Sequence, residues 1–312
     1  MNNSACSNVF ALTTPVLFVV FNRPETTRRV FEAIREARPP RLFVAADGAR
    51  PERAGESETA EQVRQIATAV DWPCELKTRF SEKNQGCRIA VSSAVDWFFS
   101  QVEEGIILED DCVPSLDFFR FCQEMLEYYR DDDRIMSISG SNMQLGRHPV
   151  ESSYYFSRYV HIWGWASWRR AWKHYDVDMK DLPSFLEENV LASLFPTRIE
   201  QRRWREILWK TYHHSPHFTT WDFQWGYTLM KRHALAVTPT CNLITNIGCT
   251  ATALHTAGNE YADIPHEPLR FPLVHPEFMY PHREADHFTF IHDFANPLLK
   301  RLANRLRRTF AG

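Results

Sequence analysis

The sequence lacks the short glycine-rich motifs that mark the commonest nucleotide-binding proteins. It contains neither a GxxxxGKS/T segment nor a GxGxxG segment, which argues against P-loop and dinucleotide-binding Rossmann chemistry. It also lacks an excess of basic residues, since 36 Lys and Arg accompany 39 Asp and Glu for a net charge of −3. That balance gives no support to bulk nucleic-acid binding. The 312 residues are sufficient for one large α/β domain with a substantial core.

Paired cysteines and long apolar runs are absent as well. The seven cysteines are odd in number and show no CxxC spacing, which favours reduced thiols in the cytosol over a disulfide framework. The start of the chain has no basic leader, and its apolar run is too short and too interrupted for a signal peptide or a membrane span. We therefore expect a soluble, cytoplasmic protein.

The first half of the chain alternates strand-like runs with amphipathic segments. Strands are expected near residues 15–21, 41–46, 74–80 and 105–109, and a helical pattern follows each of them. This arrangement predicts a mostly parallel sheet with helices on both faces, a Rossmann-like α/β fold. Ligands of such sheets bind at the carboxyl ends of the strands. Polar residues stand at three of these ends, namely Asn22, Asp47 and the acidic triplet Glu109 to Asp111.

The second half has a different character. A further strand is expected near residues 135–143, followed by an aromatic-rich stretch, a charged helical region over about 180–214 and then extended sequence. From about residue 263 the chain is rich in Pro and His and is expected to form loops. No linker is apparent, so we predict one main domain over residues 1–265 and an appended tail over residues 266–312.

The tail ends in a short amphipathic pattern, NPLLKRLANRLRRTF. Apolar residues recur every four positions along one helical face, and the same stretch contains five cations and no acid. Two interpretations stay open. The helix could attach the protein peripherally to the inner, anionic face of a membrane, or it could dock on the main domain with its leucines in a groove. The apolar residues are Leu298, Leu302, Leu306 and Phe310, and the cations are Lys300, Arg301, Arg305, Arg307 and Arg308.

The acidic triplet ends a strand that is expected to be buried, in the segment GIILEDDCVPSLDFF. Ser115, after Pro114, is the better N-cap for the helix that follows, so the three acids lie upstream of that cap in a loop. Like charges crowded at the rim of a low-dielectric sheet repel one another unless a cation joins them. Hard carboxylate oxygens suit Mg²⁺ or Mn²⁺, usually completed by substrate phosphates. The triplet therefore predicts a divalent-cation site.

Around this triplet the chain resembles the GT-A nucleotide-sugar glycosyltransferases, especially the N-acetylglucosaminyltransferase I type and its bacterial relatives. Those enzymes carry a Glu-Asp-Asp form of the DxD motif after an apolar strand, which IILEDDCVPSLDFF matches. The resemblance covers roughly residues 14–258. It implies a GT-A catalytic domain over residues 1–265, with an acceptor-side helical and loop region in the second half. It also implies an inverting, metal-dependent transfer from a UDP-sugar to a glycan or to a lipid-linked or protein-linked acceptor, in surface glycan or glycoconjugate assembly.

The resemblance also implies roles for individual residues. Asp111 would bind Mn²⁺ or Mg²⁺ directly, and Glu109 would support the loop of the same metal site. Asn22 stands where the family often has Asp. The positions that the resemblance assigns to nucleotide-sugar binding are Phe21, Asn22 and Arg23 in FNRP, Asp47 in AADG, Asn84 and Arg88 in EKNQGCR, Asp110 in the triplet, and Trp163 and Gly164 in HIWGWASW.

Three further positions belong to the same set of expectations. Asp222 in TTWDFQW is the only acid where the family places a catalytic base. His255 stands where many GT-A enzymes have a metal or diphosphate ligand, and a structural role for it stays equally open. Trp163 is the candidate for stacking on a sugar. The tryptophans after it fall at helical i, i+3 and i+7 spacing, which favours a place in the core; they are Trp165, Trp168 and Trp172.

Alternative functions are less well supported. A zinc site in YHHSPH is disfavoured because Pro216 would break the helix that could align its histidines. A sugar nucleotidyltransferase would also use strand-end carboxylates and Mg²⁺, but its first strand is usually followed by a glycine-rich basic loop, and FNRPETTRR has no glycine. A catalytically inactive sugar-binding protein on the same fold is the third hypothesis. The transferred sugar and the acceptor cannot be read from the sequence.

Overall fold

The computed structural model describes residues 10–147, 150–215, 218–248 and 264–295. The strands are β1 (Val16–Val20), β2 (Arg41–Ala46), β3 (Glu75–Phe80), β4 (Glu104–Glu109), β5 (Cys112–Pro114), β6 (Ile135–Ser139), β7 (Tyr154–Ser157), β8 (Trp165–Trp168), β9 (Leu235–Pro239) and β10 (Ile244–Asn246). The helices are α1 (Pro24–Ala37), α2 (Glu56–Ala67), α3 (Cys87–Gln101), α4 (Leu116–Tyr128), α5 (Arg169–Trp172), α6 (Leu182–Glu187), α7 (Leu191–Leu194), α8 (Arg198–Tyr212), α9 (Asp222–Arg232), α10 (Arg283–Thr289) and the π-helix η1 (Phe290–Phe294).

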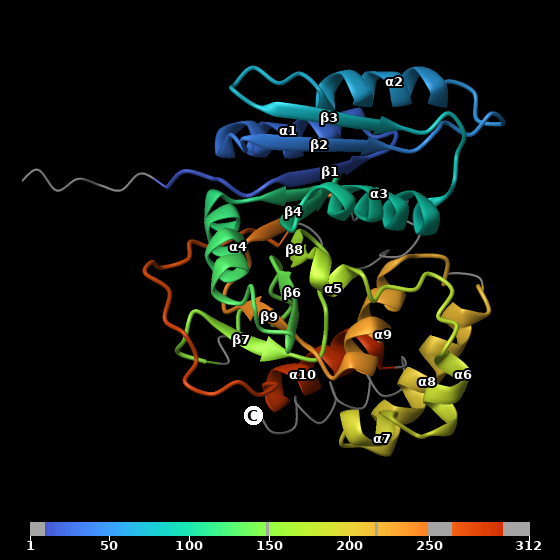
Figure 1. Cartoon of the computed structure of the whole chain (residues 1–312), viewed down its shortest axis with the longest axis vertical. Coiled ribbons are helices and arrows are strands. Elements are labelled where there is room, and N and C mark those ends of the chain that lie inside the picture. The colour runs from blue at the N-terminus through green and yellow to red at the C-terminus, as the bar shows by residue number, and fades with distance from the viewer. Residues whose placement is uncertain (1–9, 148–149, 216–217, 249–263, 296–312) are drawn as a thin grey trace, which may run out of the picture.

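One mixed sheet of eight strands runs through the described part of the molecule in the order β3-β2-β1-β4-β8-β6-β9-β7. Only β8 and β7 run antiparallel to their neighbours in it. Helices cover both faces (Figure 1): α1, α2 and α4 pack with Phe18 and Leu108 on one face, and α3, α5 and α9 pack with Leu17 and Ile107 on the other. The predicted fold class, a mostly parallel Rossmann-like α/β sheet with helices on both faces, is therefore confirmed.

The strand order creates a topological switch point at β1. From β1 the chain runs outward through β2 and β3, and then returns to pair β4 with the opposite side of β1. Connections that diverge from two adjacent parallel strands leave a crevice at the carboxyl ends of those strands, and ligands bind there. Residues 21–23 follow β1 and residues 110–111 follow β4, so both segments lie at this crevice.

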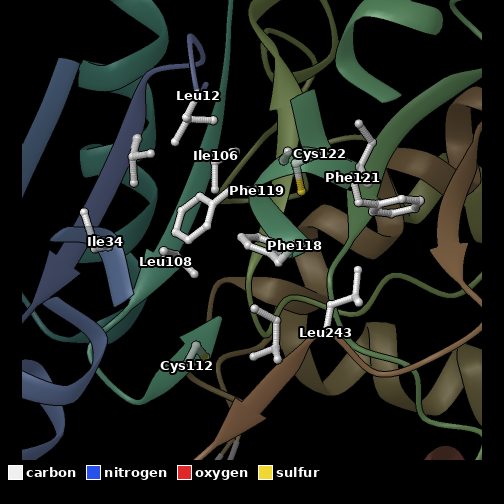
Figure 2. Packing of buried hydrophobic residues seen from close by; sticks show 14 of the residues in the cluster. Leu12, Ile34, Ile106, Leu108, Cys112, Phe118, Phe119, Phe121, Cys122 and Leu243 are labelled. Atoms are coloured by element: carbon white, nitrogen blue, oxygen red, sulfur yellow. The ribbon is translucent and has the colours of Figure 1, made fainter. Parts of the chain in front are cut away.

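Buried side chains on both sides hold the acidic triplet in place. Before the triplet, Ile106 and Leu108 of β4 belong to the core that Phe118 and Phe119 of α4 also fill (Figure 2). After the triplet, Cys112 at the start of β5 is only 1% exposed, and β5 pairs with β10 in the small second sheet. Because both ends of the short loop are fixed in the core, the carboxylates between them have little freedom to move.

The tryptophans that were predicted to lie in the core do so, but for a different reason. Trp165, Trp168 and Trp172 are 0%, 2% and 4% exposed, yet Trp165 to Trp168 form strand β8 instead of a helix. In a strand, positions i and i+3 face opposite sides. Accordingly, Trp165 packs with Trp221 on the α3 face, and Trp168 packs on the α4 face, where its Nε1 donates to the carbonyl of Leu126 at 3.2 Å.

The described part of the C-terminal region, residues 264–295, packs against the sheet. Pro281 bridges to Phe156 of the edge strand β7, and Gln144 donates to the carbonyl of Ala285. Residues 264–282 form loops, as expected, but helices α10 and η1 follow where further loop was expected. The domain boundary at residue 265 stays a prediction, and the basic amphipathic pattern after residue 296 lies outside the described residues. None of the described helices is long and apolar enough to cross a membrane.

Asp286 of α10 should make a pH-dependent contribution to stability. Its carboxylate accepts from Ser157 Oγ at 2.6 Å, and burial raises its pKa to about 6 from an ordinary value of 3.8. Between these values the folded state holds more protons than the unfolded state, so stability should fall as the pH rises from 4 to 6 and then level off. The slope from one such proton is about 1.4 kcal/mol per pH unit at most.

This slope can be isolated by substitution. Chemical unfolding of the wild type and of Asp286→Asn at pH 4, 5, 6 and 7 gives two stability curves, and all other titrating groups cancel in their difference. We expect that difference to change by about 1 kcal/mol or more between pH 4 and 6. Parallel curves for the two proteins would show that Asp286 titrates alike in the folded and unfolded chains.

Candidate functional site

A cavity of about 330 Å³ opens at the carboxyl ends of β1, β2 and β4. Its inner wall is apolar, formed by strand residues such as Ala45 and by Ala90, Val91 and Ala94 of α3. Its rim is polar and includes Arg23, Asp47, Arg50, Asn84, Glu109 and Asp110. A concave apolar pocket with a few polar groups at its rim is the usual form of a small-molecule site.

The three acids of the triplet point in different directions. Ile107 faces α3, and strand alternation places Glu109 on the same face, where it lines the cavity. Asp110 is only 3% exposed and accepts hydrogen bonds from the backbone N–H of Phe21 at 3.2 Å and from Arg23 Nη2 at 2.5 Å. The Asp111 side chain is 17% exposed, and its Oδ2 accepts from Arg23 Nη1 at 2.9 Å. Arg23 therefore bridges Asp110 and Asp111.

The electrostatics of the triplet reflect this crowding. Burial, followed by the charges of Asp111, Asp110 and Asp222, raises the pKa of Glu109 to about 8. Burial also raises the pKa of Asp110 to about 6, although Arg23 opposes the shift. Burial disfavours the charge on Arg23, but the two aspartates outweigh it and raise the pKa of the guanidinium. The raised pKa values show that burial and mutual repulsion oppose simultaneous ionisation of the triplet, although Arg23 lies beside it; a bound cation would favour the ionised carboxylates.

Asp222, the predicted base, is brought towards the triplet from a distant part of the sequence. It is the first residue of α9 and is half-buried. Its charge contributes to the raised pKa values of Glu109 and of Cys87, which also lines the cavity. Thr219, three positions earlier, lines the cavity as well. The arrangement therefore places a separate carboxylate near the acidic triplet, on an element that does not belong to the strand-end loops.

Asp47 organises the rim of the cavity. Its two carboxylate oxygens accept from the backbone N–H groups of Gly48, Gln85 and Gly86 and from Nδ2 of Asn84, all between 2.8 and 3.1 Å. These bonds tie the loop between β3 and α3 to the end of β2. Direct recognition of a base by Asp47 stays a prediction, but its visible role is to position the loop that carries Asn84 and Gly86 into the rim.

Substitution of Asp47 should separate these two roles. Asp47→Ala leaves several partly buried N–H donors without an acceptor, which typically costs about 1–3 kcal/mol of stability. If Asp47 only supports the loop, affinity should fall by a similar factor for UDP, GDP and CDP, as measured by calorimetry. If it reads the base, the loss should be largest for UDP. Asn84→Ala removes one donor of the same network and is the milder control; unchanged affinity and stability in Asp47→Ala would contradict both roles.

Asn22 and Phe21 also support the rim of the cavity. They do so through contacts with Glu56 and Arg50, which the sequence analysis did not identify. Asn22 Nδ2 donates to Glu56 Oε1 at 2.8 Å, and Glu56 is paired with Arg50, which lowers the pKa of that carboxyl to about 2. The Arg50 guanidinium lies 5.4 Å from the centre of the Phe21 ring. Arg50 and Glu56 carry no motif, and only the fold brings them beside β1.

Besides Asn22, three of the predicted nucleotide-sugar positions do not line the cavity, as far as the described residues show. Arg88 is directed to the segment after α5, with Nη1 at 3.7 Å from Asp178. Trp163 is half-buried and packs on the core. Gly164 has a φ of +60°, a backbone conformation that favours glycine, and a Cβ there would meet the Ile244 side chain at 2.4 Å. Contact of these three with a donor stays a prediction.

Gly248 approaches the Asp111 carboxylate closely. A Cβ at Gly248 would lie 2.1 Å from Asp111 Oδ2 and 2.7 Å from Arg23 Nη1, so a larger residue there would displace this ion pair. The Ile247 N–H donates to the Asp111 carbonyl at 2.9 Å, which fixes this approach. Within the described residues no three His, Cys, Asp or Glu side chains are grouped as metal ligands. His255 follows Gly248 by seven positions but lies outside the described residues.

Comparisons with known proteins add little to this geometry. No family model matches the chain, and no curated protein matches it. Similar solved structures include a cytidylyltransferase from Leptospira borgpetersenii serovar Hardjo-bovis (strain JB197), with 10% identity, a TM-score of 0.33 and coverage of 58% of this chain and 70% of that one. HddC from Yersinia pseudotuberculosis has 10% identity, a TM-score of 0.34 and coverage of 55% and 87%.

An apo UDP-glucose pyrophosphorylase has 9% identity, a TM-score of 0.35 and coverage of 73% of this chain and 90% of that one. Similarity at these levels does not establish what this chain binds or which reaction it catalyses.

Proposed function

We propose that this chain is an inverting glycosyltransferase of the GT-A type that takes its sugar from a UDP-sugar and requires Mn²⁺ or Mg²⁺. One observation supports this most directly: Asp110 and Asp111 bracket Arg23 at the switch point, beside a cavity of about 330 Å³ and near the separate carboxylate of Asp222. Such a site can bind a diphosphate through a cation and can also deprotonate an attacking hydroxyl.

The cavity would hold the nucleoside of the donor. Its apolar wall suits the faces of a base, and the polar rim around Asn84 and Asp110 offers hydrogen-bonding groups to the base and the ribose. The Arg23 side chain is 45% exposed, so part of its guanidinium can reach a diphosphate. A divalent cation held by Asp111 would stabilise the negative charge on the departing nucleoside diphosphate.

Asp222 would act as the general base. In this reaction an acceptor hydroxyl attacks the anomeric carbon, the bond from that carbon to the diphosphate oxygen breaks, and UDP leaves with the electron pair. The Asp222 carboxylate takes the proton of the attacking hydroxyl. Attack from the face opposite the leaving group inverts the anomeric configuration.

A sugar nucleotidyltransferase is the competing enzyme class. It would join a nucleoside triphosphate to a sugar phosphate and release pyrophosphate, and it has no need of a base such as Asp222. The segment after β1 also leads directly into α1 at Pro24, without the glycine-rich loop that would grip a triphosphate.

Two parallel assays test the proposal. In the first, UDP-sugars and Mn²⁺ are supplied and UDP release is measured, with and without a panel of glycan acceptors. In the second, UTP and sugar 1-phosphates are supplied and pyrophosphate release is measured. We expect turnover in the first assay only. Pyrophosphate release would assign the chain to the nucleotidyltransferases, and binding of UDP-sugars with no turnover in either assay would indicate an inactive sugar-binding protein.

Part of the proposal concerns the membrane and rests on the sequence of the tail alone. If the basic segment attaches the enzyme to an anionic membrane face, deletion of residues 297–312 should abolish sedimentation with anionic liposomes at low salt, and the melting temperature should stay unchanged. Each cation contributes about 1 kcal/mol near such a surface, so binding by the intact chain should also weaken with salt. A lower melting temperature after deletion, with no liposome binding by the intact chain, would instead indicate a docked helix.

A further inference from the structure

A second and larger cavity, of about 560 Å³, lies between the N-terminal end of α8 and helix α10. Both helices lie towards the end of the molecule that is far from strands β1, β2 and β3 (Figure 1). Three arginines from separate parts of the chain line this cavity: Arg147, Arg158 and Arg283. It shares no lining residue with the cavity beside the acidic triplet.

The buried acids of this cavity are already engaged by the protein. Glu200 closes a capping box at the start of α8, where it accepts from the Thr197 N–H at 3.1 Å and from Thr197 Oγ1 at 2.7 Å. Asp286 accepts from Ser157 Oγ at 2.6 Å and from the Arg158 N–H at 3.3 Å. Glu200 is therefore directed to the cap of α8, and Asp286 is shared between Ser157 and Arg158.

The arginines, in contrast, retain donors. Within the described residues, Arg158 is the one of the three that forms an ion pair, with Nη1 at 3.5 Å from Asp286. The Arg147 guanidinium lies over the Phe288 ring, 4.4 Å from its centre, which leaves its N–H edge available. Arg283 and the acidic Glu284 are both exposed at the start of α10. Each guanidinium offers up to five N–H groups in a fork that matches phosphate oxygens.

Helix α8 has 15 residues, and its N-terminus at Thr197 lines the cavity. The capping box and the Glu200 carboxylate already satisfy this end of the helix, so the three arginines are the groups that can attract an anion here.

We propose that this cavity binds a phosphate group carried by the acceptor. Arg158 connects it to the reaction, because the same residue lines a small adjoining cavity, of about 40 Å³, together with Asp222. An acceptor whose phosphate occupies the arginine cavity could thus extend its hydroxyl towards the proposed base. The location relative to Asp222 rests on the proposed function, whereas binding of phosphate by the three arginines does not.

Binding can be measured on the full chain by calorimetry with inorganic phosphate and with glycerol phosphate. Saturating UDP is included in one series, so that the donor site is blocked if UDP binds there. We expect the double variant Arg147→Gln, Arg283→Gln to bind both probes at least tenfold more weakly, with an unchanged melting temperature. The matched control is Arg202→Gln, an exposed arginine on the other side of α8 that lines a separate cavity; it should bind as the wild type does.

Several outcomes would overturn the inference. One is equal weakening by Arg202→Gln, which would indicate general attraction to a basic surface; another is tight binding by the double variant. Vesicles that contain phosphatidic acid distinguish a lipid phosphate from a soluble one. If the wild type binds these vesicles and the double variant does not, the result supports a lipid-linked phosphate. If the double variant still binds them, the membrane contact lies elsewhere on the protein. Failure of the proposed function is seen separately, as absence of UDP binding while phosphate binding persists.

Discussion

Asp111→Asn should abolish sugar transfer and metal-dependent UDP binding while the protein stays folded. The substitution keeps the shape of the side chain but removes the charge that would hold a cation. Loss of a group that stabilises charge in a transition state commonly lowers kcat by about 10²–10³-fold. Stability should change by less than about 1 kcal/mol, because Asp111 and Arg23 form a partly exposed ion pair and such pairs contribute little.

The control for this experiment is Asp71→Asn. Asp71 also pairs with an arginine, Arg35, but on the exposed surface of α1 and away from the cavity. Transfer, UDP binding with and without a chelator, and thermal unfolding are measured on both variants. Full activity of Asp111→Asn, or of the wild type in excess chelator, would remove the metal from the mechanism.

Asp222→Asn should separate chemistry from donor binding. An amide cannot accept the proton of an attacking hydroxyl, so kcat should fall by about 10²–10⁴-fold, the usual contribution of a general base. The affinity for UDP, measured by calorimetry, should stay within about twofold, because Asp222 does not line the donor cavity. The variant thus has the opposite signature to Asp47→Ala, which should impair binding more than turnover.

Asp222→Glu provides the internal control, since it restores a carboxylate at a slightly different position and should recover part of the activity. Donor hydrolysis without an acceptor is measured beside transfer. If Asp222→Asn transfers sugar at a rate within threefold of the wild type, the base lies elsewhere. The neighbouring helix position is Phe223, so the search would then move to another element.

The local pattern of the sequence was sufficient for most of the sheet. Runs such as Val16–Val20 are fully buried, and a continuous apolar run followed by a turn residue and an amphipathic helix has few structural alternatives to a parallel strand. The same logic failed for Trp165 to Trp168, because spacing of three fits both a helix and a strand that is buried on both faces. It also missed α10, since seven residues within Pro- and His-rich sequence carry little periodic signal.

The sequence identified candidate residues of the site but not the contacts among them. The triplet, Asn22 and Asp47 were placed at strand ends, and the structure confirms that these ends meet. The sequence did not show that Arg23 would lie between Asp110 and Asp111, 87 and 88 residues away. Nor did it show that the Asp47 carboxylate would be used to hold the loop at Gln85 and Gly86.

What the sequence determined by itself is the type of the strands and helices in the first half of the chain and the polar residues at the strand ends, because these depend mainly on neighbours along the chain. The tertiary structure alone decided which ends face one another. Pairing of β4 beside β1 brings Arg23 to the aspartates, and pairing of β10 with β5 brings Gly248 over Asp111. Folding of α8, α10 and the end of β7 against one another likewise brings three distant arginines to one cavity. Such contacts depend on strand order and helix packing over the whole chain, and no short segment contains that information.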